Sequence, residues 1–346
     1  MKFLDTPSSP HVHPAGGVTQ VMLRVIYALI PGLIAYVYFF GWGVVINIVI
    51  AAVVSLGAEA IMLALRRRPL RPFLTDASAL VTAMLLGASL PPLAPWWLVT
   101  IAALFAIVVA KHLYGGLGYN PFNPAMVGYA VVLISFPREM TAWLPPHVPD
   151  VTTLGFVDTL RYSILGHLPK GLNFDAVTMA TPLDAMKTQL GMDKTVSEIV
   201  AGSPVFGSLA GKGWEWVNGL YLLGGLWLIQ RRVITWHIPA GMLGGLFVLA
   251  LVFYLGDPDA HGSPLFELFS GAAMLGAFFI ATDPVSAATT PRGRLYYGAG
   301  IGALTFVIRT WGGYPDGVAF AVLLMNMAAP TIDYYTQPRV FGHGKD

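Results

Sequence analysis

The chain has 346 residues, of which 55% are hydrophobic and 11% are charged, and its formal net charge is +2. Because soluble domains carry about a quarter of charged residues, this composition indicates an integral membrane protein. The chain has no cysteine, which excludes disulfides, thiolate catalysis and iron–sulfur clusters held by its own cysteines.

Apolar runs long enough to cross about 30 Å of hydrocarbon recur from Val21 onward. They predict an all-α polytopic membrane protein with about ten transmembrane helices. The predicted helices cover residues 22–40, 43–65, 77–93, 95–111, 123–137, 215–230, 235–255, 265–281, 295–311 and 316–335. The stretches 77–93 and 123–137 are short, which is typical of tilted or broken helices.

The basic residues predict the orientation of these helices, because short cytoplasmic loops are enriched in Lys and Arg. The short loops near residues 41, 94, 260 and 313 hold neither residue type, and they are predicted to lie outside. Residues 1–21 and 336–346 then form a cytoplasmic arm and tail, and the long loop 138–214 lies outside. The inner segments hold the basic residues Lys2, Arg66, Arg67, Arg68, Arg71, Lys111, Arg231, Arg232, Arg292, Arg294, Arg339 and Lys345.

The sequence also suggests an internal repeat. Residues 83–88 resemble 273–277, and residues 129–134 resemble 320–325, both at an offset of about 190 residues. Five helices in each half would place the halves, 22–137 and 215–335, in opposite senses, as an inverted-topology repeat. The alternative is a chance similarity of apolar strings.

The polar stretch 175–184 within the long loop predicts a helix start. Thr181 fits the N-cap, Pro182 the first helical position, and Asp184 the third position of a capping box. A threonine hydroxyl at a helix start could also carry an esterified phosphate, which free amides and the helix dipole would stabilise. The two interpretations are compatible.

The same stretch carries the pattern Asp175-x-x-Thr178-x-Ala180-Thr181. It resembles the D-x-x-[ST]-x-A-T flavinylation motif of the Rnf D and Nqr B subunits, which belong to ion-pumping, flavin-dependent electron-transfer complexes. The resemblance extends over essentially the whole chain. Further segments that carry it are Thr75-Asp76, Gly118-Tyr119-Asn120-Pro121-Phe122-Asn123-Pro124-Ala125 and Thr282-Asp283-Pro284.

The resemblance implies that a flavin transferase joins FMN through a phosphoester to Thr181. Asp175, Thr178, Ala180 and Pro182 would then form the environment of this FMN. Thr178-Met179 departs from the Ser-Gly expected of an Nqr B subunit, and the chain is shorter than those subunits. The Rnf D subunit is therefore the better match, and Nqr B is the alternative.

Asn120, Phe122 and Asn123 lie at the predicted cytoplasmic start of helix 123–137. They fit a proline-rich helix start in which asparagine side chains satisfy loose backbone groups. They could also hold the edge and face of a ring, and the resemblance suggests a second flavin here, a non-covalent riboflavin.

Three acidic residues are candidates for an ion path. Asp76 and Asp283 are expected to cap one helix and to follow the end of another, or else to coordinate a passing cation. Glu59 lies two turns before Arg66–Arg68, so it is expected to pair with them, although an intramembrane acid is itself a functional candidate. Lys111, His112 and the pairs Trp96-Trp97 and Trp214-x-Trp216 are expected at the membrane interfaces.

No metal site, Walker loop or Rossmann fingerprint is recognisable in the sequence. The resemblance therefore implies a subunit, incomplete as an enzyme by itself, of a complex that links ferredoxin and NAD couples to Na⁺ or H⁺ translocation in the bacterial inner membrane, with the loop 138–214 periplasmic. Partner chains would supply the iron–sulfur and NAD sites and a second flavinylated subunit. The flavin transferase and the lipid bilayer are the other expected partners, and nothing points to nucleic acid. A stand-alone inverted-repeat carrier or channel, with 138–214 as an external lid, is the rival class.

Overall fold

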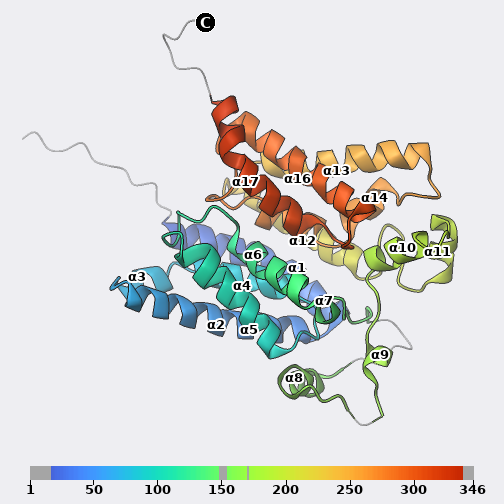
Figure 1. Ribbon diagram of the computed structural model, residues 1–346, viewed down its shortest axis with the longest axis horizontal. Helices are drawn as coiled ribbons and strands as arrows, with labels where there is room; N and C mark the ends of the chain where they lie inside the picture. Colours follow the sequence, from blue (N-terminus) through green and yellow to red (C-terminus); the bar gives the residue numbers. More distant parts are fainter. Residues whose placement is uncertain (1–16, 148–153, 170, 338–346) are drawn as a thin grey trace, which may run out of the picture.

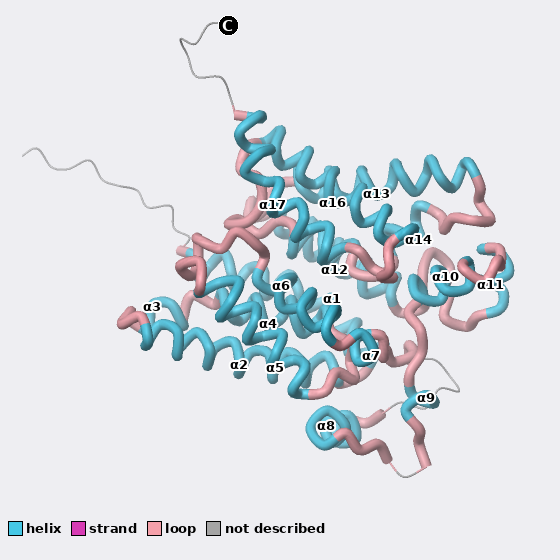
Figure 2. The backbone as a smooth tube through the Cα atoms, viewed as in Figure 1, coloured by secondary structure: helices cyan, strands magenta, loops and turns pink. Residues whose placement is uncertain are grey.

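The computed structural model describes residues 17–147, 154–169 and 171–337, with the side chains of all of these except 175 and 176. The greater part of the predicted arm and tail lies outside the described residues. Helices are the regular elements of the described part, and Figure 2 shows them joined by loops without a strand. The fold is therefore all-α, as predicted.

The helices form two groups that follow each other in the sequence (Figure 1). The first group contains α1 (Val18–Phe40), α2 (Gly43–Leu65), α3 (Leu70–Leu74), α4 (Ser78–Ser89), α5 (Trp96–Leu104) with its continuation η1 (Phe105–His112), and α6 (Pro124–Ser135). The second group contains α12 (Trp214–Gln230), α13 (His237–Gly256), α14 (Pro264–Phe269), α15 (Ala273–Leu275) with η2 (Gly276–Ile280), α16 (Pro291–Trp311) and α17 (Val318–Thr336). Each stretch predicted as a helix is helical, although 265–281 is interrupted between α14 and α15.

Five of the described helical segments are long and apolar enough to cross a membrane. They are α1, α2, the segment Leu70–Ser89, α13 and α17, and the shorter segments Trp96–His112 and Pro124–Ser135 are also apolar. The chain is thus a polytopic membrane protein. Ten crossings and an inverted repeat remain predictions.

The two groups pack on each other through α1 against α12 and α6 against α17. Within each group the neighbours correspond: α2 lies beside α5 and α5 beside α6, while α13 lies beside α16 and α16 beside α17. Glycines permit the close approach of α13 and α16, because a Cβ at Gly241 or Gly245 would lie 2.6 Å or 2.7 Å from a carbonyl oxygen of α16. Such small-residue contacts are typical of membrane helices.

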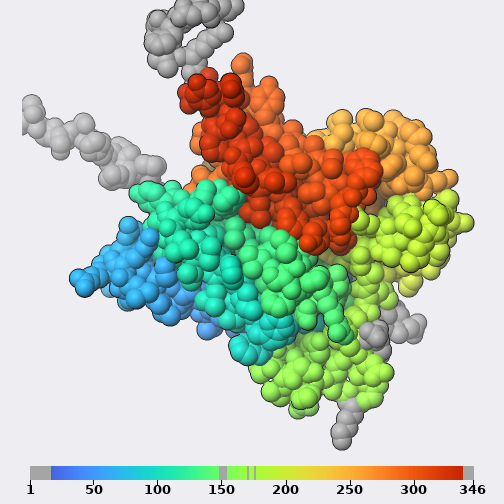
Figure 3. Space-filling view, viewed as in Figure 1, coloured from blue at the N-terminus to red at the C-terminus, as the bar shows by residue number. Residues whose placement is uncertain are grey.

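The loop between the groups forms short helices at one end of the bundle. They are α7 (Pro137–Met140), α8 (Phe156–Leu165), α9 (Phe174–Val177), α10 (Pro182–Leu190) and α11 (Val196–Gly202). In Figure 3 the yellow-green part of this segment, with α10 and α11, lies against the second group of helices, and the green part, with α8, lies against the first. The described ends of the chain, at α1 and α17, lie at the opposite end of the bundle (Figure 1).

Candidate functional site

Thr181 caps the helix α10. Its Oγ1 accepts a hydrogen bond from the backbone N–H of Asp184 at 3.2 Å, and Pro182 occupies the first helical position. The predicted N-cap at Thr181 and the position of Pro182 are therefore confirmed, whereas α10 shows no reciprocal capping-box bond from the Asp184 carboxylate among the described contacts. Burial raises the pKa of the Asp184 carboxyl, and the nearby charge of Lys187 acts in the opposite direction.

The segment between α9 and α10 is held against residues that follow α7. The N–H of Met179 donates to the carbonyl of Trp143 at 2.8 Å, and Thr178 Oγ1 donates to the carbonyl of Phe174 at 3.0 Å. Ala180 is exposed. The side chain of Asp175 lies outside the described residues, so its predicted role stays a prediction.

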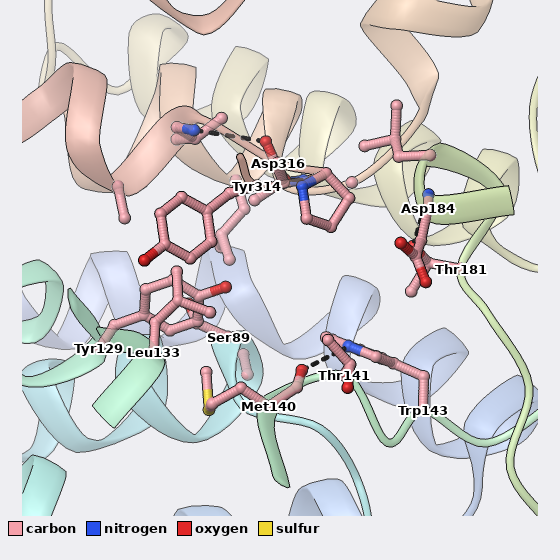
Figure 4. Close-up of a pocket in the computed structure, with 18 of the residues that line it drawn as sticks. Ser89, Tyr129, Leu133, Met140, Thr141, Trp143, Thr181, Asp184, Tyr314 and Asp316 are labelled. Atoms are coloured by element: carbon pink, nitrogen blue, oxygen red, sulfur yellow. Dashed lines mark hydrogen bonds between the residues drawn. The ribbon is translucent and has the colours of Figure 1, made fainter. Parts of the chain in front are cut away.

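Thr181 lines a cavity of about 250 Å³ at the junction of the two helix groups. In Figure 4, Thr181 and Asp184 lie on one side of this cavity, and Tyr129 and Leu133 of α6 lie on the other. The lining comes from α1, α4, α6, α7, α10, α12, α15, η2 and α17 together with the loops beside them. Such a hollow between bundled helices is a common place for a ligand.

Aromatic side chains form much of the cavity wall. The ring of Tyr36 is nearly parallel to that of Trp143, and their centroids are 6.5 Å apart. The ring centroids of Trp143 and Trp214 are 5.3 Å apart. Tyr129 and Tyr221 also line the cavity. The prediction that Trp214 belongs to an interfacial belt is wrong, because packing on α1 and on Trp143 buries it.

A buried arginine braces the polar side of the cavity. Arg309, near the end of α16, pairs with Glu267 at 2.9 Å and with Asp316 at 3.2 Å. It also donates to the carbonyls of Glu267 and Ser270, at 2.6 Å and 3.1 Å. These carbonyls belong to the end of α14, where the helix is interrupted.

Asp316 connects this brace to the cavity. Its Oδ2 accepts from the N–H of Ala272 at 2.7 Å, on the other side of the interruption, and its side chain lines the cavity (Figure 4). Gly271 has φ +58 at the break, where a side chain would be strained. No motif in the sequence singled out Arg309, Glu267 or Asp316. The available signal was Arg309 inside the predicted helix 295–311, since an intramembrane charge needs a partner.

Lys187 docks α10 on the second helix group. Its Nζ donates to the carbonyls of Ile308, Arg309 and Tyr314 at 3.2, 2.8 and 3.2 Å. Burial lowers the pKa of this amine, and the charges of Asp184 and Glu267 oppose that effect. A cation at these carbonyls also complements the C-terminal end of the α16 dipole.

The asparagines of the segment 118–125 make contacts between helices. Asn123 caps α6 through Met126 N–H at 3.2 Å, and its Nδ2 donates to the carbonyl of Ile280 at 3.1 Å. Its own N–H donates to Asn326 Oδ1 at 3.1 Å. Asn120 Nδ2 donates to the carbonyl of Phe122 at 3.0 Å, and Phe122 itself is half-buried. These contacts fit the first interpretation, in which the asparagines satisfy the backbone.

Glu59 does not pair with Arg66–Arg68, and that prediction is wrong. Its Oε1 lies 2.5 Å from Lys111 Nζ and 3.5 Å from His112 Nε2, on η1. Lys111 and His112 are buried rather than interfacial, because η1 packs on α2. The arginines follow the end of α2 and are exposed there.

Asp76 extends this buried cluster. Lys111 Nζ donates to Ser78 Oγ at 2.8 Å, and Ser78 Oγ donates to Asp76 Oδ1 at 2.6 Å. Asp76 also accepts from the backbone N–H of Ser78, the first residue of α4, at 2.7 Å, although Ala77 rather than Asp76 occupies the N-cap of that helix. Asp76 and Glu59 are thus joined through Lys111 and Ser78.

Asp283 lies apart from that cluster, just after η2 ends at Ile280, as predicted. Its Oδ2 accepts from Ser286 Oγ at 2.8 Å. It also lines a second, smaller cavity of about 120 Å³, together with Thr282 and Arg294. Within the described residues no group of three or more His, Cys, Asp or Glu side chains could hold a metal ion.

Residues 5–342 match the family described as NQR2, RnfD, RnfE. The match covers nearly the whole chain. The chain belongs to this family. This agrees with the resemblance given by the motif 175–181 and the segment 118–125.

Curated relatives of similar length share one name, which describes the D subunit of an ion-translocating oxidoreductase complex. One from Aliivibrio salmonicida (strain LFI1238) is 54% identical over 352 residues and covers 100% of both chains. One from Pseudomonas aeruginosa (strain UCBPP-PA14) is 57% identical over 343 residues, 99% of this chain and 97% of the relative. One from Shewanella amazonensis (strain ATCC BAA-1098 / SB2B) is 53% identical over 338 residues, 97% of each chain.

Proposed function

We propose that this chain is the D subunit of an ion-translocating oxidoreductase complex of the Rnf type, and that Thr181 carries FMN through a phosphoester. The observation that carries the FMN proposal is the position of Thr181. Its hydroxyl caps α10 at the edge of a cavity that both helix groups line. The sequence pattern 175–181 points independently to the same residue.

The surroundings of Thr181 suit such a group. The start of α10 offers backbone amides and the positive end of a helix dipole to a phosphate. The aromatic walls formed by Tyr36, Trp143 and Tyr129 suit a flat ring system. The bound flavin would supply the electron transfer, and the protein would fix its position and surroundings. Thr178, Ala180 and Pro182 would shape the segment that presents it, together with Asp175.

A second, non-covalent flavin such as riboflavin is proposed near Asn120, Phe122 and Asn123. These residues lie beside the ends of α6 and η2 and do not line the cavity at Thr181, although Asn123 bonds to Met126 and Ile280, which do line it. Two flavins so separated would form part of an electron path across the membrane. Partner subunits of the complex would supply the iron–sulfur and NAD sites, and a flavin transferase would attach the FMN.

The proposed topology has ten crossings in two inverted five-helix repeats. Both termini would be cytoplasmic and the loop 138–214 periplasmic, in the bacterial inner membrane. The helix positions and the corresponding neighbours of the two groups support this arrangement. Alkaline phosphatase fused after residue 170 is then expected to be active, and after residue 70 inactive. The reverse pattern would overturn the topology.

The ion path is proposed to involve Glu59, Asp76 and Asp283, moving Na⁺ or H⁺. Glu59 and Asp76 support this because they belong to one buried cluster between α2, α4 and η1. Moving one charge across 100 mV corresponds to about 2.3 kcal/mol. Electron transfer between flavins could therefore drive ion movement electrically or through a conformational change.

In-gel fluorescence tests the attachment site. The chain is expressed with a flavin transferase and denatured, and its band is expected to keep flavin fluorescence. Thr181→Val is expected to abolish the fluorescence, while Thr188→Val, on the exposed side of the same helix, is expected to retain it. Mass spectrometry should place an FMN-sized addition on Thr181.

Three outcomes of this experiment would change the proposal. Fluorescence that survives Thr181→Val would overturn the attachment site. A wild-type band without flavin fluorescence would favour the stand-alone carrier or channel. Loss of fluorescence in both variants would point to a general failure of α10 to fold.

A further inference from the structure

The helix α8 exposes its apolar side. Phe156, Val157, Ile164 and Leu165 are 46%, 64%, 50% and 62% exposed. Phe156, Leu160 and Ile164 follow one another at a spacing of four residues, so they share a face of the helix. Helices on the surface of soluble proteins show the opposite arrangement, with the apolar face turned to the core.

Small polar residues form the inner face of α8. Thr159 and Ser163 are 1% and 2% exposed. Thr159 Oγ1 donates to the carbonyl of Gly155 at 2.9 Å, and Ser163 Oγ donates to the carbonyl of Ala94, between α4 and α5, at 3.2 Å. The bond from Ser163 to Ala94 ties α8 to the helix bundle, and the burial of Thr159 and Ser163 shows which side of α8 faces inward.

The position of α8 points to what covers its outer face. Figures 1 and 2 show α8 end-on, while α2 and α5 run along the plane of the picture, so α8 lies across the bundle axis. The helix α8 contacts α2. The ring centroids of Phe156 and Trp42, the residue just before α2 begins, are 5.7 Å apart. The apolar side of α8 thus continues the exposed apolar side of α2, where Val49 and Val53 are 54% and 67% exposed.

We propose that α8 lies in the membrane plane at the bilayer surface, with Phe156, Val157, Ile164 and Leu165 among lipid acyl chains. The occupant of this surface is lipid because α2 is a candidate membrane span, and the apolar side of α8 adjoins the start of α2 through the contact of Phe156 with Trp42. Interfacial helices bury their apolar face about 5–10 Å into the boundary of headgroups and acyl chains. Arg161 is exposed on the same face, four residues from both Val157 and Leu165, and its long side chain can extend the charge to the headgroups.

This anchoring would also hold the following chain close to the membrane. Leu154, just before α8, and Val177, at the end of α9, are buried in one cluster with Leu93. The membrane contact of α8 and the segment that leads to Thr181 therefore share a small core. The inference stands independently of whether Thr181 carries a flavin.

Spin-label accessibility tests the proposal, and the cysteine-free chain makes single labels straightforward. Val157→Cys and Ile164→Cys are labelled in the full chain, both alone and in the purified complex, in nanodiscs. Val53→Cys on α2 serves as the lipid reference, and Met192→Cys, 65% exposed after α10, as the water reference. Collision rates with oxygen and with a water-soluble nickel chelate are compared.

The oxygen-to-nickel ratio at residues 157 and 164 is expected to be several-fold above that at residue 192, and to approach that at residue 53. A ratio equal to that at residue 192 would overturn the proposal in favour of a water-exposed helix. Low collision rates with both reagents in the complex, but not in the isolated chain, would overturn it in favour of a protein partner. A label at residue 161 should give a lower ratio than one at residue 157.

Discussion

Two buried clusters of charge, one in each helix group, occupy corresponding places. Lys111 lies at the end of η1, the fourth predicted helix, and Arg309 lies near the end of α16, the ninth. Each cation meets carboxylates from neighbouring segments: Glu59 in the first group, and Glu267 and Asp316 in the second. The first cluster lies near the α3 end of the bundle, and the second borders the cavity at Thr181.

The two clusters differ in how completely their polar atoms are paired. Arg309 uses Nε, Nη1 and Nη2 for bonds to Glu267, Ser270 and Asp316. Among the described residues, the first cluster leaves Glu59 Oε2 and the ring nitrogen Nδ1 of His112 buried without a hydrogen-bond partner, whereas the unpaired buried atom beside Arg309 is the neutral hydroxyl of Ser270. A buried network whose charged groups are paired makes a region rigid, whereas unpaired atoms of a carboxylate or imidazole retain the capacity to bind.

The difference suggests separate roles for the clusters. The arginine cluster fixes the interruption between α14 and α15 and so shapes the cavity wall. The lysine cluster keeps polar atoms available inside the membrane region, which is where a moving ion or proton needs them. Four substitutions test this comparison.

Arg309→Met should have the largest effect, because it leaves the buried Glu267 and the half-buried Asp316 without their cation. Breaking a buried ion pair by removing one partner costs about 3–5 kcal/mol. The loss is measured as a lower free energy of unfolding in nanodiscs. Arg231→Met, at the exposed end of α12, is the control and is expected to change stability by less than about 0.5 kcal/mol. Equal effects of the two substitutions would refute the bracing role.

Glu59→Gln should cost less, about 2 kcal/mol, because its amide oxygen can still accept from Lys111 and Lys111 keeps its bond to Ser78. Ion translocation by the assembled complex in proteoliposomes is expected to fall, while in-gel flavin fluorescence stays. Glu139→Gln, on α7, is the matched control. Unchanged ion movement would remove Glu59 from the proposed path.

Lys187→Met should destabilise α10 locally by about 1.5 kcal/mol, because three carbonyls lose a charged donor. Faster amide hydrogen exchange over residues 182–190 measures this effect. Lys194→Met is the control, since Lys194 is exposed and bonds to Gln189 alone among the described residues. If exchange is unchanged, the arginine cluster does not support α10 through Lys187.

Asp184→Asn should have the smallest effect and should depend on pH. Because the folded state raises the pKa of Asp184 above its usual value, the folded protein binds the proton more tightly than the unfolded chain. Its contribution to stability is full below about pH 3.8 and is lost as pH rises through the raised pKa. In the variant, the free energy of unfolding is expected to vary less with pH, and the difference from the wild type should stay below about 1 kcal/mol. A steeper profile would contradict the assigned direction.

Some parts of the structure follow from residues close together in the sequence. Apolar runs predicted the positions of the helices, because an apolar segment in a membrane must satisfy its backbone within itself. The pair Thr181-Pro182 predicted the start of α10, and Asp76 the start of α4, because a cap bond spans only two or three residues. The pattern 175–181 and the segment 118–125 predicted the family for the same reason, since each is a local pattern.

Other parts depended on contacts between distant segments. Glu59 lies seven positions before Arg66, and sequence spacing favoured that pair, yet Glu59 binds Lys111, 52 residues away. The sequence predicted Trp214 at the membrane interface, but the side chain is buried because it packs on Tyr36 and Trp143. The same holds for Lys187, whose carbonyl acceptors lie more than a hundred positions away.

The sequence alone determined the class of the protein, its helix positions and the cap at Thr181. Tertiary structure decided that this cap faces a cavity, that Arg309 braces the wall of that cavity, and that α8 turns its apolar side outward. The physical reason is range. Hydrophobic length and capping act over a few neighbouring residues, whereas burial and ion pairing depend on which helices pack together.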